Sequence, residues 1–535
     1  MVSAGRAAVL ILVTAALVTG VGLLAAGASG HPSGASARGE ISQLTWALPE
    51  AIRGLDYTHS ADGGTATVIS LGMEPLVRYD KLGRLTPALA KSFSTPNPTT
   101  YVYNLRSGVK FWDGHPLTTD DVIYSLQQSA SKAAGSQVAS FFSDVKSMTA
   151  TGANQVTIKL NKPNPFFRYS IAVTYIGEKA YWSTHLKDLG TSTGLNMGTG
   201  PYQFTSFTSG QNVILTANPN YWGPKPTVQK IVIDFITDPA TLLLAVRSGQ
   251  ADGTFNIPQQ QVDQYKKLPN TKVNLAPELR TAYLSLDTES PPFNDIHVRR
   301  AIAYAVDKSG LVKAVLAGYG QTAPAMPPPQ QWGDLLSQSK VNSFYATLPK
   351  YSFSMAKAKA ELAQSAYPKG FKATVPFPDS EPQLGKLVLS LSQNLKQLGV
   401  TLNVKQETSS AWFNTLYSHP KPMGMQVVSW VPDYPDPADA AALIYDSAFS
   451  TKNSFNTANY KNPKMDALLA KQQGSVSNAV RAKAIQGILQ LGAQDLPYIP
   501  VWYDEIGMAL NSKYKISNFG PWYLYSPWAS NITAG

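Results

Sequence analysis

Residues 384–405 read LGKLVLSLSQNLKQLGVTLNVK, and this stretch decides the fold class. Leucines recur in it at spacings of three and four, at Leu384, Leu387, Leu391, Leu395 and Leu398. Such spacing places them on one face of an amphipathic helix, which Gly399 can end. Residues 401–405 then alternate between apolar and polar side chains, as a strand with one buried face does. A helix that leads directly into a strand is typical of α/β domains, in which helices pack on sheets.

Other segments predict further strands. Residues 101–105 and 156–160 alternate between apolar and polar side chains, which indicates strands with one buried face. Residues 213–215 and 231–236 are additional strand candidates. The pair Asp113-Gly114 is a turn signal that closes a hairpin-like stretch after the first of these strands.

Two more helices have clear ends in the sequence. Thr118 can cap the start of one helix, and Asp121 at the third helical position can complete a capping box with it. Asp238 followed by Pro239 predicts the start of another, which Gly249 can end. The alternation of helices and strands on both sides of residues 384–405 supports the α/β assignment.

Length and charge limit the classes of function. A chain of 535 residues is too long for one hydrophobic core and predicts two or three structural units. Its composition, 44% hydrophobic and 15% charged, is that of a globular protein. The net charge is +11, but the basic residues are dispersed, and the densest spots are only pairs, such as Lys266-Lys267. We therefore expect no nucleic-acid partner, because such a partner requires a clustered basic patch.

The sequence carries no recognisable catalytic constellation. It contains no cysteine, which excludes disulfides, thiol catalysis, thiolate metal sites and a lipid anchor on cysteine. No two of its six histidines lie three to five residues apart, so no helical pair for zinc exists. Ser-x-x-Lys occurs at Ser129, Ser337 and Ser354 without the companion motifs of penicillin-binding enzymes. We expect neither an enzyme nor a cofactor or metal site.

The first residues resemble an export signal. Arg6 precedes an uncharged apolar run at 7–26, and small residues at 26–28 and 35–37 fit the pattern that signal peptidase cleaves. Residues 1–28 are thus a signal peptide or an uncleaved membrane anchor, since the run is about long enough to span a bilayer. Residues 29–39 have the composition of a flexible linker. Either reading predicts a protein that acts outside the cytoplasm.

One aromatic loop is a candidate binding site. Residues 429–437 read SWVPDYPDP and follow a strand-like run at 425–428. Loops at strand ends are usual places for ligands in α/β domains. Trp430 and Tyr434 can supply apolar ring surfaces that also carry an N–H or O–H group, and Asp433 can bind a cation. The alternative is a rigid proline turn whose Asp residues only cap backbone amides.

Ten short blocks resemble solute-binding protein family 5, which serves ABC importers of oligopeptides, dipeptides, nickel and related solutes. The blocks are EPLV (74–77), LTPALA (85–90), YVYNLR (101–106), VKFWDG (109–114), LTTDDV (117–122), GTGPY (198–202), NPNYW (218–222), RSGQAD (247–252), VRRAI (298–302) and PYIPV (497–501). Each block is weak alone. Their shared order and spacing across nearly the whole chain make the resemblance specific.

This resemblance implies the two-lobed periplasmic-binding-protein type II architecture, an α/β fold with a hinge and an additional inserted domain. Lobe one would comprise residues 40–70, 196–283 and 496–535. The extra domain inserted in it would be 71–195, and lobe two would be 284–495. The chain would cross between the lobes near 284 and near 496, and lobes joined in this way close on a ligand by a hinge motion.

The resemblance also implies a role for the aromatic loop. In peptide-binding members, the Asp of a Trp-x-x-Asp-Tyr-like segment pairs with the α-ammonium of the peptide, and Trp430, Asp433 and Tyr434 match that segment. The implied partners are a small peptide or peptide-like ligand and the membrane permease of an ABC transporter, with the protein itself a monomer. Metal chelates, sugars and opines are alternative ligands, and a signalling receptor or, least favoured, a secreted hydrolase is an alternative function.

Overall fold

The computed structural model describes residues 39–535. The predicted leader at 1–28 and all but the last residue of the linker at 29–39 lie outside the described residues. Within residues 39–535, no helix has both the length and the apolar character needed to cross a membrane.

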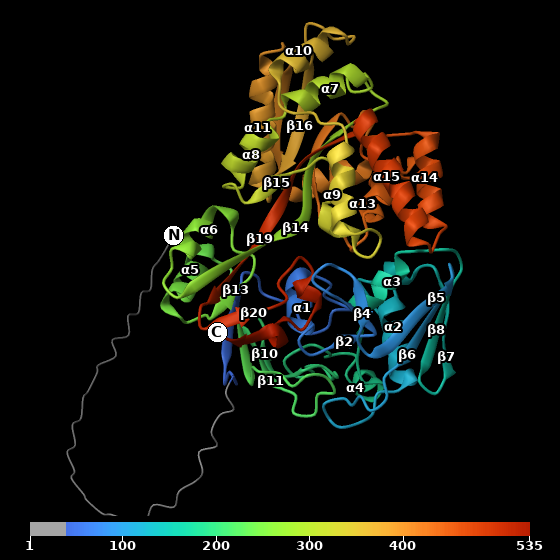
Figure 1. The fold of residues 1–535 in the computed structure, drawn as a ribbon, viewed down its shortest axis with the longest axis vertical. Helices are drawn as coiled ribbons and strands as arrows, with labels where there is room; N and C mark the ends of the chain where they lie inside the picture. The colour runs from blue at the N-terminus through green and yellow to red at the C-terminus, as the bar shows by residue number, and fades with distance from the viewer. Residues whose placement is uncertain (1–38) are drawn as a thin grey trace, which may run out of the picture. The chain divides into compact units, whose positions relative to one another are not determined.

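One large mixed sheet runs through the described part of the chain (Figure 1). Its strands follow the order β10-β11-β12-β1-β13-β19-β14-β18, and β15 pairs with β19. In that order they are Tyr202–Thr208, Asn212–Ala217, Lys230–Phe235, Leu44–Leu48, Gly253–Thr254, Tyr498–Asn511, Thr271–Leu286 and Met425–Trp430, with β15 at Gly320–Thr322. Strand β1 is parallel to β12 and β13, and the other pairs are antiparallel.

The two longest strands, β14 and β19, join the two halves of this sheet. They pair antiparallel and lie side by side (Figure 1). Strand β13 pairs near one end of this pair and β18 near the other. The register of β14 with β19 shifts between Pro277 and Thr281 of β14. On both strands, the residues on the two sides of this shift pack in different hydrophobic cores. Leu279 packs in the first core and Ala282 in the second. On β19, Ile506 packs in the first core and Val501 in the second.

The change of core divides the described residues into two lobes, as expected. We call the part around the first core lobe one and the part around the second core lobe two. The first core also contains Tyr103, Ile158 and Phe167, so residues of the extra domain share a continuous core with lobe one. The domain boundaries at 71, 196, 284 and 496 stay predictions.

The extra domain is built on a four-stranded antiparallel sheet of order β5-β6-β8-β7. These strands are Ala90–Asn97, Thr100–Leu105, Gln155–Leu160 and Val145–Gly152. Helix α2 (Thr119–Ala130) begins at the predicted capping box, in which the Thr118 side chain and the Asp121 side chain each accept from the other's backbone N–H. The predicted strands at 101–105 and 156–160 are confirmed.

Smaller elements complete lobe one and the extra domain. The helices are α1 (Gly63–Ile69), α3 (Phe167–Ser170), α4 (Lys179–Thr184), α5 (Pro239–Ser248) and α6 (Val262–Lys266). The short strands are β2 (Glu74–Pro75), β3 (Val77–Tyr79), β4 (Leu85–Pro87), β9 (Tyr175–Ile176), β20 (Tyr514–Ile516) and β21 (Ile532–Ala534). Helix α5 begins after Asp238, which caps Thr241, and ends at Gly249 in the left-handed conformation (φ 78°), as predicted.

Lobe two contains the helix-strand unit that the leucine spacing predicted. Helix α11 (Pro382–Lys396) buries the predicted leucines through Leu395, and β17 (Thr401–Glu407) follows it and pairs in parallel with β16 (Lys372–Pro378). The other helices of lobe two are α7 (Ile296–Ala305), α8 (Lys308–Val315), α9 (Gln338–Thr347), α10 (Met355–Ala363), α12 (Ser409–Ser418), α13 (Ala438–Ile444), α14 (Pro463–Gln473) and α15 (Asn478–Asp495). The α/β prediction is confirmed.

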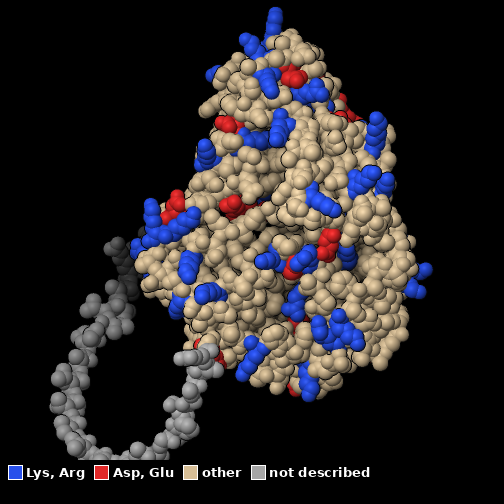
Figure 2. Space-filling view, viewed as in Figure 1, with Lys and Arg blue, Asp and Glu red and all other residues tan. Residues whose placement is uncertain are grey.

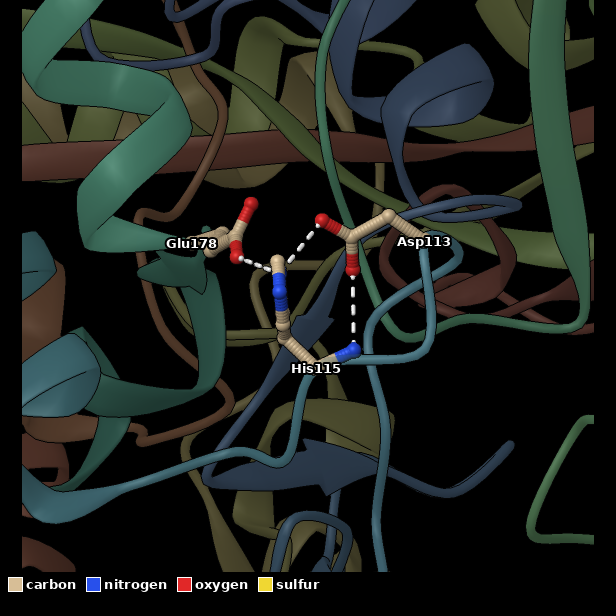
Figure 3. Close-up of side chains that lie close together, drawn as sticks. All are labelled: Asp113, His115 and Glu178. Carbon is tan, nitrogen blue, oxygen red and sulfur yellow. Dashed lines mark hydrogen bonds and ion pairs between the residues drawn. The ribbon is translucent and has the colours of Figure 1, made fainter.

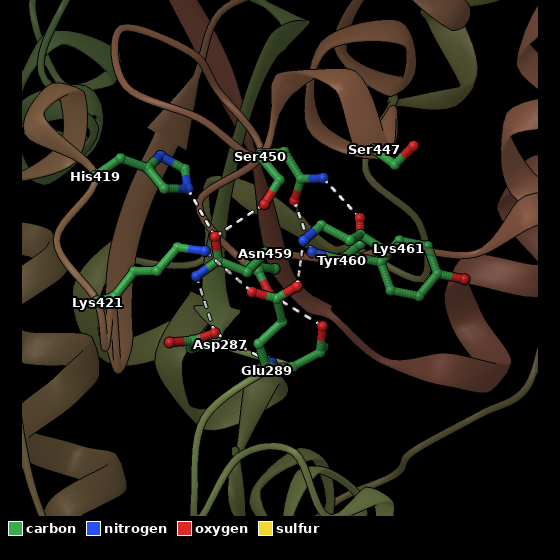
Figure 4. Close-up of polar contacts among 12 residues, drawn as sticks. Asp287, Glu289, His419, Lys421, Ser447, Ser450, Asn459, Tyr460 and Lys461 are labelled. Atoms are coloured by element: carbon green, nitrogen blue, oxygen red, sulfur yellow. Dashed lines mark hydrogen bonds and ion pairs between the residues drawn. The ribbon is translucent and has the colours of Figure 1, made fainter.

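A buried polar network holds lobe two together where β14 ends (Figure 4). Asp287 is fully buried and accepts hydrogen bonds from the Met423 N–H (2.8 Å) and from Asn459 Nδ2 (3.0 Å). Asn459 Oδ1 in turn accepts from Ser450 Oγ and lies 2.9 Å from His419 Nε2. The loop before β18 is therefore tied to the end of β14, which fixes the strand that leads into the aromatic loop.

Candidate ligand-binding cleft

The predicted binding loop leaves β18 at the junction of the lobes. Trp430, the last residue of β18, pairs with Thr281 of β14, beside the register shift. Residues 431–437 then run to helix α13. The sheet therefore brings the loop to the place where the two hydrophobic cores meet.

A cavity of about 170 Å³ lies between this loop and lobe one. Val431 and Pro432 of the loop form one side of it. Glu278, Leu279 and Ile506, near the register shift of β14 and β19, also line it. Lobe one contributes Glu50, Gly63, Thr67, Asn256 and the C-terminal segment 521–525. The cavity thus has walls from both lobes and from the strands that join them.

The charged groups in this lining are acidic. Burial raises the pKa of the Glu50 carboxyl, and the nearby negative charge of Asp62 raises it further. Burial also raises the pKa of Glu278, against the opposing effect of Arg280. Neither Lys nor Arg is among the described residues that line the cavity. Such a site favours a ligand with a positive charge, because that charge would stabilise the ionised carboxylates.

Asp433 lies next to this cavity with its carboxylate unpaired. Its side chain has no hydrogen-bond partner among residues 39–535, and the surrounding protein raises its pKa by desolvation. Its charge raises the pKa of Tyr525, which lines the cavity, and of Tyr434. Asp433 is exposed to solvent and yet close to these rings, as expected of a group in a hollow. A ligand atom can therefore reach it.

Asp436 and Asp439 accept hydrogen bonds from backbone N–H groups, which is the role that the alternative prediction gave to Asp residues in this loop. Asp436 Oδ1 accepts from the Ala438 N–H at 3.0 Å. Asp439 Oδ2 accepts from the Asp433 N–H at 3.0 Å. Asp436 is also fully buried and bound by Arg481 through two hydrogen bonds of 2.7 and 3.1 Å. The turn is therefore rigid, and its shape does not depend on the Asp433 carboxylate.

Tyr434 connects the loop to the extra domain. Its ring stacks on Phe166 (centroids 6.0 Å apart, planes at 10°) and on Tyr169 (6.0 Å, 25°), and it meets Phe141 at 5.6 Å. The Tyr169 ring lies 6.4 Å from Tyr79, from which the aromatic contacts continue to Trp522 and Tyr525 of the cavity wall. This aromatic cluster spans lobe two, the extra domain and the cleft.

Trp430 lies apart from the cavity lining. Its ring contacts Phe455 edge to face at 5.5 Å and packs against the hydrophobic cluster of lobe two that contains Trp412. The structure therefore brings Asp433 and Tyr434 toward lobe one, whereas Trp430 supports the loop from the side of lobe two. Trp430 as a ligand contact stays a prediction.

Arg280 lies close to three carboxylates at the junction of the lobes. The guanidinium of Arg280 lies 3.5 Å from Glu278, 3.6 Å from Glu381 and 3.6 Å from Asp504. Burial and the charge of Glu278 raise the pKa of Asp504 to about 7 despite Arg280. Acidic groups thus outnumber basic ones where β14 and β19 pass between the lobes.

Comparison with known proteins shows which family has this architecture. The chain matches the profile of bacterial extracellular solute-binding proteins, family 5 Middle, over residues 84–452. The chain belongs to this family. Family 5 proteins are the substrate-binding components of ABC importers, and this chain is one of them. The two-lobed arrangement and the cavity between the lobes are what such a component requires.

Individual relatives are similar over most of the chain. Heme-binding protein A of Haemophilus influenzae is 26% identical over 453 residues, which cover 79% of this chain and 80% of that protein. Nickel-binding protein NikA of Staphylococcus aureus is 25% identical over 463 residues, or 84% and 87%. The structure of DppA from Helicobacter pylori in complex with the peptide STSA superimposes with a TM-score of 0.72 at 24% identity and covers 93% of this chain and 98% of that one.

Several cavity residues of this family 5 protein were not predicted from the sequence. Glu50, Glu278 and Tyr525 come from three distant segments and meet only in the folded chain. The one available signal was the aromatic run PWYLY at 521–525. Nothing in that run indicates that it faces the loop at 431–437.

Proposed function

We propose that this protein captures a short, peptide-like solute that carries a cationic group. The observation that carries the proposal is the unpaired carboxylate of Asp433 beside a cavity whose charged lining groups, Glu50 and Glu278, are also acidic. A ligand ammonium at this place would form charge-assisted hydrogen bonds, each worth about 1.5–3 kcal/mol. The rings of Trp522 and Tyr525 offer apolar surface to the rest of the ligand.

The size of the cavity supports a short ligand. Its volume of about 170 Å³ is below the range of about 300–1,000 Å³ that is usual for pockets of drug-sized molecules. A ligand in it would contact both lobes, so binding would favour the closed arrangement in which Tyr434 stacks on Phe166. Closure links ligand capture to recognition by the membrane permease, which we propose as the protein partner of a monomeric receptor.

The ligands named for the relatives can be weighed against this cleft. Heme is large and carries propionate carboxylates, which the acidic lining would repel. A peptide offers an α-ammonium to Asp433, and the peptide-bound DppA structure shares the fold. Nickel is also a cation, as the name of NikA indicates, so a metal complex is the second candidate for the same acidic cleft. We favour the peptide because the aromatic walls suit an organic ligand.

We further propose that the cleft binds without chemical conversion. The residues around Asp433 offer aromatic rings and carboxylates, and the sequence lacks a recognisable nucleophile motif. We place the protein outside the cytoplasm, exported by the segment 1–28. A secreted hydrolase remains the least favoured alternative, and turnover of the bound ligand during long incubation would favour it.

Native mass spectrometry of the purified protein tests the ligand class directly. We expect a retained solute with a free amine, recovered intact. Calorimetric titration with dipeptides and with their N-acetylated forms then measures how much the ligand's ammonium charge contributes to the affinity. The acetylated forms should bind at least about 30-fold more weakly, which corresponds to about 2 kcal/mol. Equal affinities of the two forms would contradict the proposal, and tight binding of nickel alone in the cleft would favour the second candidate.

A further inference from the structure

Three potential metal ligands meet in the extra domain, outside the cleft (Figure 3). Asp113 and His115 belong to the turn that was predicted after β6, in which Gly114 has a φ of 97°. Glu178 stands at the N-cap of α4 but uses no side-chain bond to cap that helix. None of the three residues lines the cavity beside Asp433.

The ligand atoms of these residues converge on one nitrogen. His115 Nδ1 lies 2.8 Å from Asp113 Oδ2 and 2.8 Å from Glu178 Oε1 (Figure 3). All three atoms are within 4.8 Å of one another. The other Asp113 oxygen, Oδ1, accepts from the His115 N–H at 3.0 Å, which fixes the orientation of the Asp113 carboxylate.

A single N–H must serve both carboxylates in this arrangement. The Glu178 side chain is only 8% exposed, and among residues 39–535 its sole hydrogen-bond partner is His115. Two carboxylates thus share one N–H where a divalent ion would contact all three groups at once.

We propose that Asp113, His115 and Glu178 bind a divalent transition-metal ion of the Zn²⁺ type. One imidazole and two carboxylates are ligands that zinc accepts, and three protein ligands leave a fourth position for water. With bonds of about 2.0–2.2 Å, tetrahedral ligands are about 3.3 Å apart, so the Nδ1–O distances need widen by only about 0.5 Å. His115 is 70% exposed, so an ion can enter from solvent.

Histidine spacing in the sequence could not reveal this site. His115 has no second histidine nearby, and Glu178 follows it by 63 residues. The ligands meet because the turn after β6 and the start of α4 pack together in the extra domain. A bound ion would tie these two segments to one another and would stabilise the fold, since it binds the folded state in preference to the unfolded one.

Titration of the chelator-treated full chain with ZnCl₂ tests the proposal. We expect a saturable site in the wild type and at least about 10-fold weaker binding in His115→Ala and in Glu178→Gln. His297→Ala is the matched control, because His297 Nδ1 also lies 2.8 Å from a carboxylate, Glu361, but from only one. This control should bind Zn²⁺ as the wild type does.

Thermal melts provide an independent readout. Zn²⁺ should raise the melting temperature of the wild type by about 2 °C or more and that of His115→Ala by less, whereas Mg²⁺ should have no effect on either. The Zn²⁺-induced shift is measured against each protein's own metal-free melting temperature, because His115→Ala also removes the hydrogen-bond partner of the buried Glu178 carboxylate. Lack of saturable Zn²⁺ binding by the wild type, or equal affinities of the wild type and His115→Ala, would overturn the proposal.

Discussion

The backbone N–H of Asp433 donates to Asp439 Oδ2 at 3.0 Å, so the carboxylate of one Asp fixes the main chain of the other. Asp439 is buried, and burial followed by the charge of Asp433 raises its pKa well above the ordinary value. This shift favours the neutral form of Asp439, while the Asp433 side chain has no hydrogen-bond partner among residues 39–535. A cation that binds Asp433 would offset the charge of that residue and so remove one of the causes that raise the pKa of Asp439.

The acid cluster at the lobe junction predicts a pH dependence of stability. Asp504 keeps its proton in the folded protein up to pH 7 or so, whereas in the unfolded chain it releases the proton near its ordinary pKa of about 3.9. The folded state thus binds the extra proton between these values, so the free energy of unfolding falls as pH rises from about 4 to about 7.

Replacement of Asp504 isolates that contribution. Asp504→Asn should remove part of this slope and stabilise the protein by about 1–3 kcal/mol at pH 8, where the wild type must bury a charge. Urea unfolding at pH 5 and pH 8 measures both values. An unchanged slope in Asp504→Asn would show that Asp504 is not the group responsible.

The stack of Tyr434 on Phe166 and Tyr169 predicts an effect on lobe closure. Tyr434→Ala removes these contacts and should weaken ligand binding by about 1–3 kcal/mol, because the closed state loses aromatic contacts between the lobes. At saturating ligand, small-angle scattering should give Tyr434→Ala a larger radius of gyration than the wild type. Tyr434→Phe keeps the ring and is the control. Equal affinity and compaction in all three proteins would rule out a role for the stack.

The buried pair of Arg481 and Asp436 should be the main support of the binding loop. Both side chains are at most 1% exposed, so Arg481→Ala leaves a buried carboxylate without its partner. We expect the free energy of unfolding to fall by about 3–5 kcal/mol.

A surface pair provides the comparison for Arg481. Arg53 and Asp62 lie 3.4 Å apart, but the Arg53 side chain is 68% exposed. Arg53→Ala should cost less than about 1 kcal/mol in the same denaturant titration. Similar losses in the two variants would mean that burial does not govern the strength of the Arg481 pair.

The local structure could largely be predicted from the sequence because local rules determine it. The leucine spacing and Gly399 predicted α11 and β17, and the capping box of Thr118 and Asp121 is present as expected. The binding loop was found because a strand, two aromatic residues and an acid follow one another in the chain. Each of these patterns is complete within about 20 residues.

The composition of the cleft could not be predicted in this way. Glu278 and Tyr525 come together with the loop only through the pairing of β14 with β18 and β19 and the packing of the C-terminal segment on lobe one. The three-residue cluster around His115 depends on a contact of the same long-range kind. The sequence also did not indicate that Trp430 packs against Phe455 rather than along the cavity.

The most direct test of the proposed function is the affinity of Asp433→Asn for the solute recovered from the wild type. If Asp433 anchors a cationic group, calorimetry should show binding weaker by about 2–5 kcal/mol, because the ligand charge loses its partner. The melting temperature should stay near that of the wild type, since the Asp433 carboxylate has no partner within residues 39–535. Asp120→Asn, a change at a side chain that is 73% exposed, should alter neither value. Full affinity of Asp433→Asn would contradict the account, and an uncharged or anionic ligand would then be the better assignment.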